Sequence, residues 1–232
     1  MSPRLTRKLH RWLGLLFSLS ILMSSGSGVT HVIMTRTQSP PPAAKPSGAL
    51  LDAATITVPP SVALAGRPIA AANLRNIGGI PYYQCFVVGQ QNLLYLNAQS
   101  GAETPGADAK YAREIARDFL NSEELTQTNY LTAFDSEYIG IFRILPVYRF
   151  DLADGKGTRV YVSTMTGSVT RHTDDGKQFE ASVFTNFHKL GFIPNKDARD
   201  WTLTLLTSAT FVVALLGIAL FFMTRPKKRA VT

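Results

Sequence analysis

Residues 201–223 read WTLTLLTSATFVVALLGIALFFM, a run of 23 residues without a formal charge. As a helix, this run would span about 34 Å, and the hydrocarbon core of a bilayer is about 30 Å thick. A second uncharged run of 23 residues, WLGLLFSLSILMSSGSGVTHVIM, occupies residues 12–34. The sequence therefore predicts two transmembrane helices, one near each end of the chain.

The N-terminal run has two interpretations. Basic residues, an apolar stretch and the small residues of 24–28 also fit a cleaved secretory signal. Against this, apolar character resumes at 29–34, and Ser20, Ser24 and Gly28 fall four residues apart on one ridge, where small side chains let membrane helices approach. The C-terminal run has a comparable small face, made of Thr207, Thr210, Ala214 and Gly217. We expect a retained helix that packs against the second one through these ridges.

The net charge of +8 comes from the two ends of the chain. Four basic residues precede the first run and four follow the second: Arg4, Arg7, Lys8, Arg11, Arg225, Lys227, Lys228 and Arg229. Residues 35–200 hold 16 Lys and Arg against 16 Asp and Glu. The positive-inside rule then predicts that both termini are cytoplasmic and that the central domain is periplasmic, at a bacterial inner membrane. The basic excess indicates contact with a lipid bilayer, not with nucleic acid.

The central domain contains an internal repeat. Residues 81–101 read PYYQCFVVGQQNLLYLNAQSG, and residues 146–167 read PVYRFDLADGKGTRVYVSTMTG. The matched pairs are Pro81 with Pro146, Tyr83 with Tyr148, Tyr95 with Tyr161, and Gly101 with Gly167. Each copy has the pattern of a β-hairpin around a polar turn. A hairpin needs a covering element, because two strands alone are marginally stable.

Candidate helices precede both hairpins. Asp108 is predicted to cap a helix over 109–120, which places Tyr111, Ile115 and Phe119 on one face. Ser61–Leu74 is the weaker equivalent before the first hairpin, and 128–135 and 137–144 have the composition of further strands. The single cysteine, Cys85, lies in an apolar run and is predicted to be a buried strand residue.

These patterns predict an α+β fold in which two transmembrane helices flank a periplasmic domain of two helix-plus-antiparallel-hairpin repeats. The expected segments, in chain order, are a basic cytoplasmic tail (1–11), the first transmembrane helix (12–34), a Pro-rich linker (35–54), the first repeat (55–105), the second repeat (106–180), a membrane-proximal segment (181–200), the second transmembrane helix (201–223) and a basic tail (224–232).

Two parts of the sequence carry a family resemblance. The hairpins, with Pro-x-Tyr at one end and Tyr ahead of Ser-Gly or Thr-Gly at the other, resemble PepSY domains. RKLHRWLGLLFSLSILMSSGSGV at 7–29 and FHKLGFIP at 187–194 resemble the PepSY-associated transmembrane family. Larger members of that family have four membrane helices and are linked to iron uptake, and some resemble haem-containing reductases. This chain has two such runs, so a homodimer or a membrane-protein partner would be needed for a four-helix core.

Histidines are the candidate haem ligands that the resemblance implies. His10 and His31 lie 21 residues apart, about 31 Å along one helix, so they cannot share a haem within one chain. His31 and His188 are both expected on the outer side, where two imidazoles could bind a haem b. The other interpretation makes His10 and His188 interfacial residues beside Trp12 and Trp201. His172, the fourth histidine, lies in the central domain.

The resemblance implies an accessory or partner-binding subunit of an iron-related membrane electron-transfer system. Two alternatives remain: a haem-binding redox subunit that acts as a dimer, and an anchored modulator of a periplasmic peptidase. The sequence has no phosphate-binding glycine loop and no CxxC, HExxH or GxSxG motif. We therefore predict no catalytic residues and no metal site.

Overall fold

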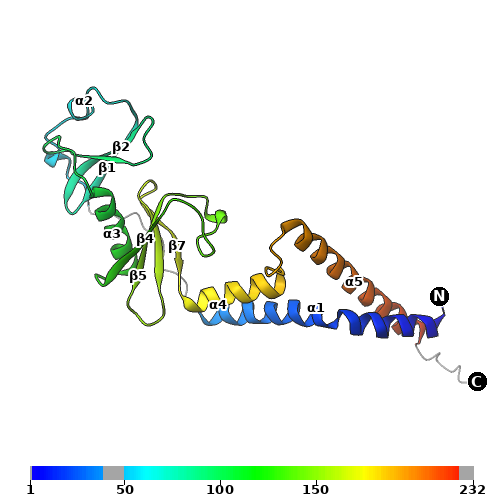
Figure 1. Ribbon diagram of the computed structural model, residues 1–232. Coiled ribbons are helices and arrows are strands. Elements are labelled where there is room, and N and C mark those ends of the chain that lie inside the picture. The colour runs from blue at the N-terminus through cyan, green and yellow to red at the C-terminus, as the bar shows by residue number, and fades with distance from the viewer. Residues whose placement is uncertain (1, 39–49, 225–232) are drawn as a thin grey trace, which may run out of the picture. The chain divides into compact units, whose positions relative to one another are not determined.

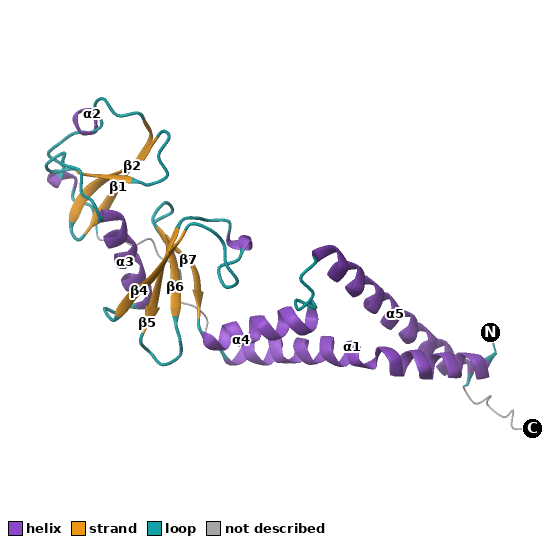
Figure 2. Cartoon of the chain, viewed as in Figure 1, coloured by secondary structure: helices purple, strands orange, loops and turns teal. Residues whose placement is uncertain are grey.

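The computed structural model describes residues 2–38 and 50–224. The chain forms two compact units, a helical unit (1–39 and 177–232) and a central unit (40–176). Most of the predicted Pro-rich linker and the basic residues that follow Thr224 lie outside the described residues. The fold combines helices and sheets, and two long apolar helices flank a small sheet domain in the sequence (Figures 1 and 2).

The helical unit is built on α1 (Pro3–Thr37) and α5 (Lys196–Met223). Ser2 caps α1 ahead of a proline in its first turn, and Asn195 caps α5 by accepting a hydrogen bond from Ala198 N. Both helices are long and apolar enough to cross a membrane. Their apolar side chains are mostly uncovered, as at Leu16 (69% exposed) and Leu205 (67%), which distinguishes them from the core helices of a soluble protein.

A shorter helical segment, which we call the arm, completes this unit. It consists of α4 (Asp175–Val183) and the π-helix η3 (Phe184–His188), which packs against α1. The chain then turns through 189–195 and enters α5. In Figure 1, α5 lies beside α1 near the N-terminus of the chain and diverges from it toward η3.

The first sheet of the central unit has the order β1-β2-β3 and is antiparallel. Its strands are β1 (Ile69–Ile77), β2 (Ile80–Val87) and β3 (Leu94–Asn97). The predicted helix over Ser61–Leu74 is wrong. Only α2 (Pro60–Ala63) is helical, after the short 3-10 turn η1 (Ala53–Thr55). The chain leaves the helix at Gly66 with φ +73° and then pairs as β1 with β2 across a Gly78-Gly79 turn.

The second sheet has the order β4-β5-β6-β7 and is also antiparallel. Its strands are β4 (Leu125–Leu131), β5 (Val147–Leu152), β6 (Arg159–Ser163) and β7 (Ser168–Thr173). The predicted strand over 137–144 is wrong, because this segment is a turn that contains the 3-10 helix η2 (Gly140–Phe142). Asp135 Oδ1 accepts hydrogen bonds from the backbone N–H groups of Glu137 and Tyr138 and so closes the turn.

The two hairpins found in the sequence have the same register. Gln84 pairs with Tyr95 in β2–β3, and Arg149 pairs with Tyr161 at the matching position of β5–β6. The glycines that end the two copies, Gly101 and Gly167, both have positive φ, at +74° and +67°. The glycines that helped to identify the repeat therefore have equivalent backbone conformations.

Helix α3 (Ala107–Leu120) joins the two sheets (Figure 2). The predicted helix over 109–120 is confirmed, with Tyr111 and Ile115 buried in the main core and Phe119 packed against it. Asp108 does not cap the helix. Gly106 holds that position, and the Asp108 carboxylate accepts hydrogen bonds from the hydroxyls of Tyr95 at 2.7 Å and Tyr148 at 2.9 Å.

Asp108 thus ties one strand of each hairpin to the start of α3. Burial, reinforced by this carboxylate, raises the pKa of both tyrosines above the ordinary range, so both hydroxyls remain donors at neutral pH.

We predict that Asp108→Ala lowers the free energy of unfolding by about 2–3 kcal/mol, because two tyrosine hydroxyls lose a charged acceptor. The measurement is urea denaturation of the full chain in detergent, followed by the near-ultraviolet circular dichroism of the tyrosines. Asp118→Ala is the matched control on the same helix, since its carboxylate is exposed and bonds the neighbouring Arg117, and should cost less than about 0.5 kcal/mol. Equal losses in the two variants would contradict the assignment.

Candidate functional site

The two long helices contact each other between the start of α1 and the C-terminal half of α5. His10 Nδ1 lies 3.1 Å from the carbonyl oxygen of Val213, and a Cβ built on Gly217 would lie 3.0 Å from His10 Cε1. Thr6 Oγ1 lies 3.9 Å from the sulfur of Met223. We call this contact the crossing. Here the imidazole of His10 lies against Gly217 of α5, where a larger side chain would collide with it.

The small residues predicted to pack the two long helices together do not all lie at the crossing. Of the predicted set, Gly217 lies at the crossing, whereas Ala214 is exposed and a Cβ on Gly28 would meet nothing within 4 Å. Ser20 and Ser24 on α1 line a pocket together with Thr207 and Thr210 on α5. The additional close glycine is Gly14, whose Cβ would lie 3.8 Å from Val213.

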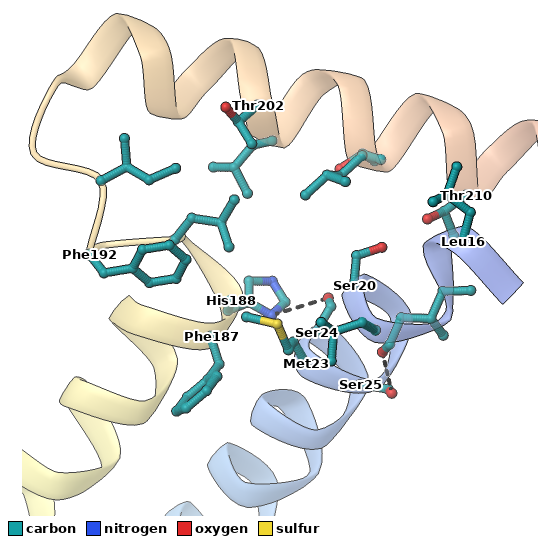
Figure 3. A pocket seen from close by; sticks show the side chains of 17 residues that line it. Leu16, Ser20, Met23, Ser24, Ser25, Phe187, His188, Phe192, Thr202 and Thr210 are labelled. Carbon is teal, nitrogen blue, oxygen red and sulfur yellow. Dashed lines mark hydrogen bonds between the residues drawn. The ribbon is translucent and has the colours of Figure 1, made fainter.

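This pocket is the candidate functional site. It has a volume of about 550 Å³ and lies between α1, α5 and the end of η3 with the loop after it. Most of its lining is apolar, from Leu16, Leu19, Met23, Leu190, Phe192 and Leu206. His188 points into the space between α1 and α5 in Figure 3. A mostly apolar pocket with a few converging polar groups is typical of small-molecule sites.

His188 is held by α1. Its Nδ1 lies 3.2 Å from Ser27 Oγ and 3.5 Å from Ser24 Oγ, and its ring stacks on Phe184 at 4.6 Å. The Ser27 side chain is buried, so this hydrogen bond lies on the packed side of the imidazole. The π-helical turn of η3 positions the ring against α1.

His31 lies one turn beyond Ser27 on α1 and has a different partner. Its Nδ1 lies 2.5 Å from Glu180 Oε1, and Thr35 donates a longer hydrogen bond of 3.4 Å to the same oxygen. Its ring also packs on Phe184, at 5.6 Å between centroids. The contact therefore pins α4 to α1.

The three candidate haem ligands lie at two separate places in the helical unit. His10 is bonded at the crossing, far along α1 from the other two, as the sequence spacing required. His31 and His188 both pack on Phe184, and each has its hydrogen-bond partner at Nδ1, so Nε2 is the remaining nitrogen of each ring. Two imidazoles that bind a haem must face each other across the porphyrin, and here the Phe184 ring lies beside both.

The central unit contains charged groups that hold the fold together. Arg159 bonds Glu137 through both ends of its guanidinium at 2.7 Å and also bonds Asp175 at 2.7 Å. Burial acts to raise the pKa of Glu137, but the hydrogen bonds from Arg159 and Tyr161 outweigh it and lower the pKa. Within residues 2–38 and 50–224, no group of three or more His, Cys, Asp or Glu residues could hold a metal ion.

Cys85 is fully buried in β2, as predicted, and burial raises the pKa of its thiol. His172 lies in β7, where its ring packs on Phe119 at 5.7 Å. A smaller pocket of about 300 Å³ lies beside Asp108, and its lining includes Tyr130, Tyr148 and Asn92.

We predict that Gly217→Leu separates the two long helices at the crossing, because the added side chain meets His10, and that it weakens their packing by about 1–3 kcal/mol. Cysteines that replace Thr6 and Met223, in a Cys85→Ala background, should be joined by a short bis-maleimide in the parent and much less in the Gly217→Leu variant. Gly26→Leu is the control, since nothing lies within 4 Å of that position. Equal cross-linking in both variants would contradict the packing.

No family model, curated protein or solved structure matches the chain.

Proposed function

We propose that this protein is a membrane-anchored accessory subunit whose PepSY-like domain lies in the periplasm and binds a membrane-protein partner, as part of an iron-related electron-transfer system. The observation that carries the proposal is the pair of long apolar helices whose side chains are mostly uncovered. In water these surfaces would cost about 25 cal/mol per Å² of exposed apolar area, and a bilayer or a partner helix removes that cost.

The charge distribution supports the orientation. All of the basic excess lies in the two tails, and the central domain is neutral overall. Since Lys and Arg near the ends of membrane helices favour the cytoplasmic side, two helices with basic outer flanks place the connecting domain on the other side. An inner membrane with both termini in the cytoplasm is the arrangement that this pattern favours.

The central unit supports a binding role over a catalytic one. Its buried and half-buried ionisable groups are engaged in internal contacts, with Asp108 on two tyrosines and Glu137 on Arg159 and Tyr161. Groups bound in this way stabilise a scaffold, which supports a binding role. The iron-related setting is carried by the resemblance to the PepSY-associated transmembrane family.

The orientation can be tested by thiol labelling. In a Cys85→Ala background, Gln90→Cys places an exposed thiol in the β2–β3 turn, and Thr232→Cys places one at the C-terminus. A membrane-impermeant maleimide should label position 90 in spheroplasts and position 232 only after lysis. Labelling in the opposite order, or of both positions in intact spheroplasts, would contradict the orientation.

The accessory role can be tested by gentle purification from native membranes, with spectra recorded before and after dithionite. We expect a stoichiometric membrane-protein partner and no haem that depends on this chain. A Soret band that shifts on reduction and is lost in His31→Ala, but kept in His172→Ala, would replace the accessory role with the redox-subunit alternative. Co-purification with a protease, and altered proteolysis on deletion, would favour the peptidase modulator.

A further inference from the structure

Three of the hydroxyls that line the α1–α5 pocket share one hydrogen-bonding direction. Three of its hydroxyls already donate to carbonyl oxygens of their own helices: Ser20 to Phe17 at 2.9 Å, Ser25 to Ile21 at 2.6 Å and Thr202 to Ala198 at 2.7 Å. A hydroxyl that donates to its helix retains only its acceptor capacity. Thr207 and Thr210 add two hydroxyls on α5, which can donate or accept.

The tautomer of His188 follows from its contact with α1. The carbonyl oxygen of Ser24 lies 2.9 Å from Ser27 Oγ and can take its proton, which leaves Ser27 Oγ to accept from His188. On this basis we assign the proton to Nδ1 of His188, and the Ser27→Ala variant below tests the assignment. In a neutral imidazole, the other nitrogen then has a lone pair and no proton. Nε2 accordingly presents an acceptor.

A pocket whose polar groups mainly accept hydrogen bonds selects a ligand that donates one. We propose that the α1–α5 pocket binds an apolar molecule that carries a hydroxyl group, which donates to Nε2 of His188. Isoprenoid hydroquinones and lipid alcohols are the two membrane-soluble sources of this chemistry. The inference depends on insertion in a bilayer and is independent of any protein partner.

The size and lining of the pocket fit this class of molecule. Its volume of about 550 Å³ lies within the range of about 300–1,000 Å³ found for ligand sites. Leucines of α1 and α5 provide an apolar surface for a ring or chain, and Phe187 and Phe192 lie at the end where His188 enters (Figure 3). The ligand would insert between helices that diverge from the crossing.

Titration calorimetry of the full chain in lipid nanodiscs, under anaerobic conditions at pH 7.5, can test the proposal. A decyl-substituted benzohydroquinone should bind about tenfold more tightly than the matching benzoquinone, because the quinone only accepts hydrogen bonds and leaves Nε2 without a donor. Dioctanoylglycerol supplies the lipid-alcohol source. If it competes with the hydroquinone and binds more tightly, the hydroxyl chemistry holds and the lipid alcohol is the ligand.

Three variants sharpen the test. His188→Phe keeps an aromatic ring against Phe184 and should remove the preference for the hydroquinone. Ser27→Ala keeps His188 but removes the acceptor that fixes its tautomer, so the preference should shrink. Ser18→Ala is the control, because Ser18 is not among the residues that line the pocket and its hydroxyl donates to the carbonyl oxygen of Leu15 on its own helix.

Equal binding of hydroquinone and quinone, or binding unchanged in His188→Phe, would overturn the proposal. So would the absence of binding by both hydroxyl compounds. Because the measurement uses the isolated chain, such a failure would leave the partner-binding role untouched, and a missing partner would leave this result untouched.

Discussion

The crossing of α1 and α5 determines the arrangement of the whole helical unit. His10 is an imidazole inside a helix pair, and it is tolerated because Val213 offers a carbonyl oxygen and Gly217 offers space. His10 is half-buried, and a polar group taken out of water needs such a partner. Since the helices meet near the two ends of the chain and diverge beyond, their other halves cannot fill the space between them. There η3 packs on α1, and the end of η3 and the loop after it line one side of the pocket.

In the central unit, small elements are stabilised by packing on a shared helix. Two hairpins, each too small to be stable alone, share a single helix, α3, whose buried face contributes to one core with strands of both sheets. Asp108 reinforces the arrangement because its two oxygens accept hydrogen bonds from one tyrosine of each hairpin. The repeated hairpins are therefore joined by one helix and one carboxylate, where the sequence repeat had suggested a helix for each copy.

Patterns of apolar residues predicted the larger features of the fold. The two uncharged runs, the hairpins at 81–101 and 146–167 and helix α3 were all visible in the sequence because each has a regular period or clear turn residues. The errors occurred where long-range pairing decided the structure. Residues 69–77 have helix-compatible composition but gain a strand partner in β2, and the apolar residues of 137–144 pack as a turn against Tyr161.

The sequence predicted only part of the candidate site. Spacing along one helix placed His10 far from His31, and His31 and His188 both pack on Phe184. Their separate partners, Glu180 and Ser27, could not be predicted, because they depend on how α4 and η3 pack on α1. Phe184 was missed altogether, and its only signal was its spacing of four residues before His188. The pocket arises from the angle between two helices, which no local pattern encodes.

The π-helical conformation of η3 has an evolutionary consequence. A π-helical turn accommodates one residue more than an α-helical turn, so the direction of His188 depends on the number of residues in 184–188 as well as on their identity. Loss of a single residue would restore α-helical geometry and rotate the imidazole by about 100° around the axis, away from Ser27. Among descendants of this chain, insertions and deletions in this short segment should therefore be rarer than substitutions, even at positions whose side chains face solvent.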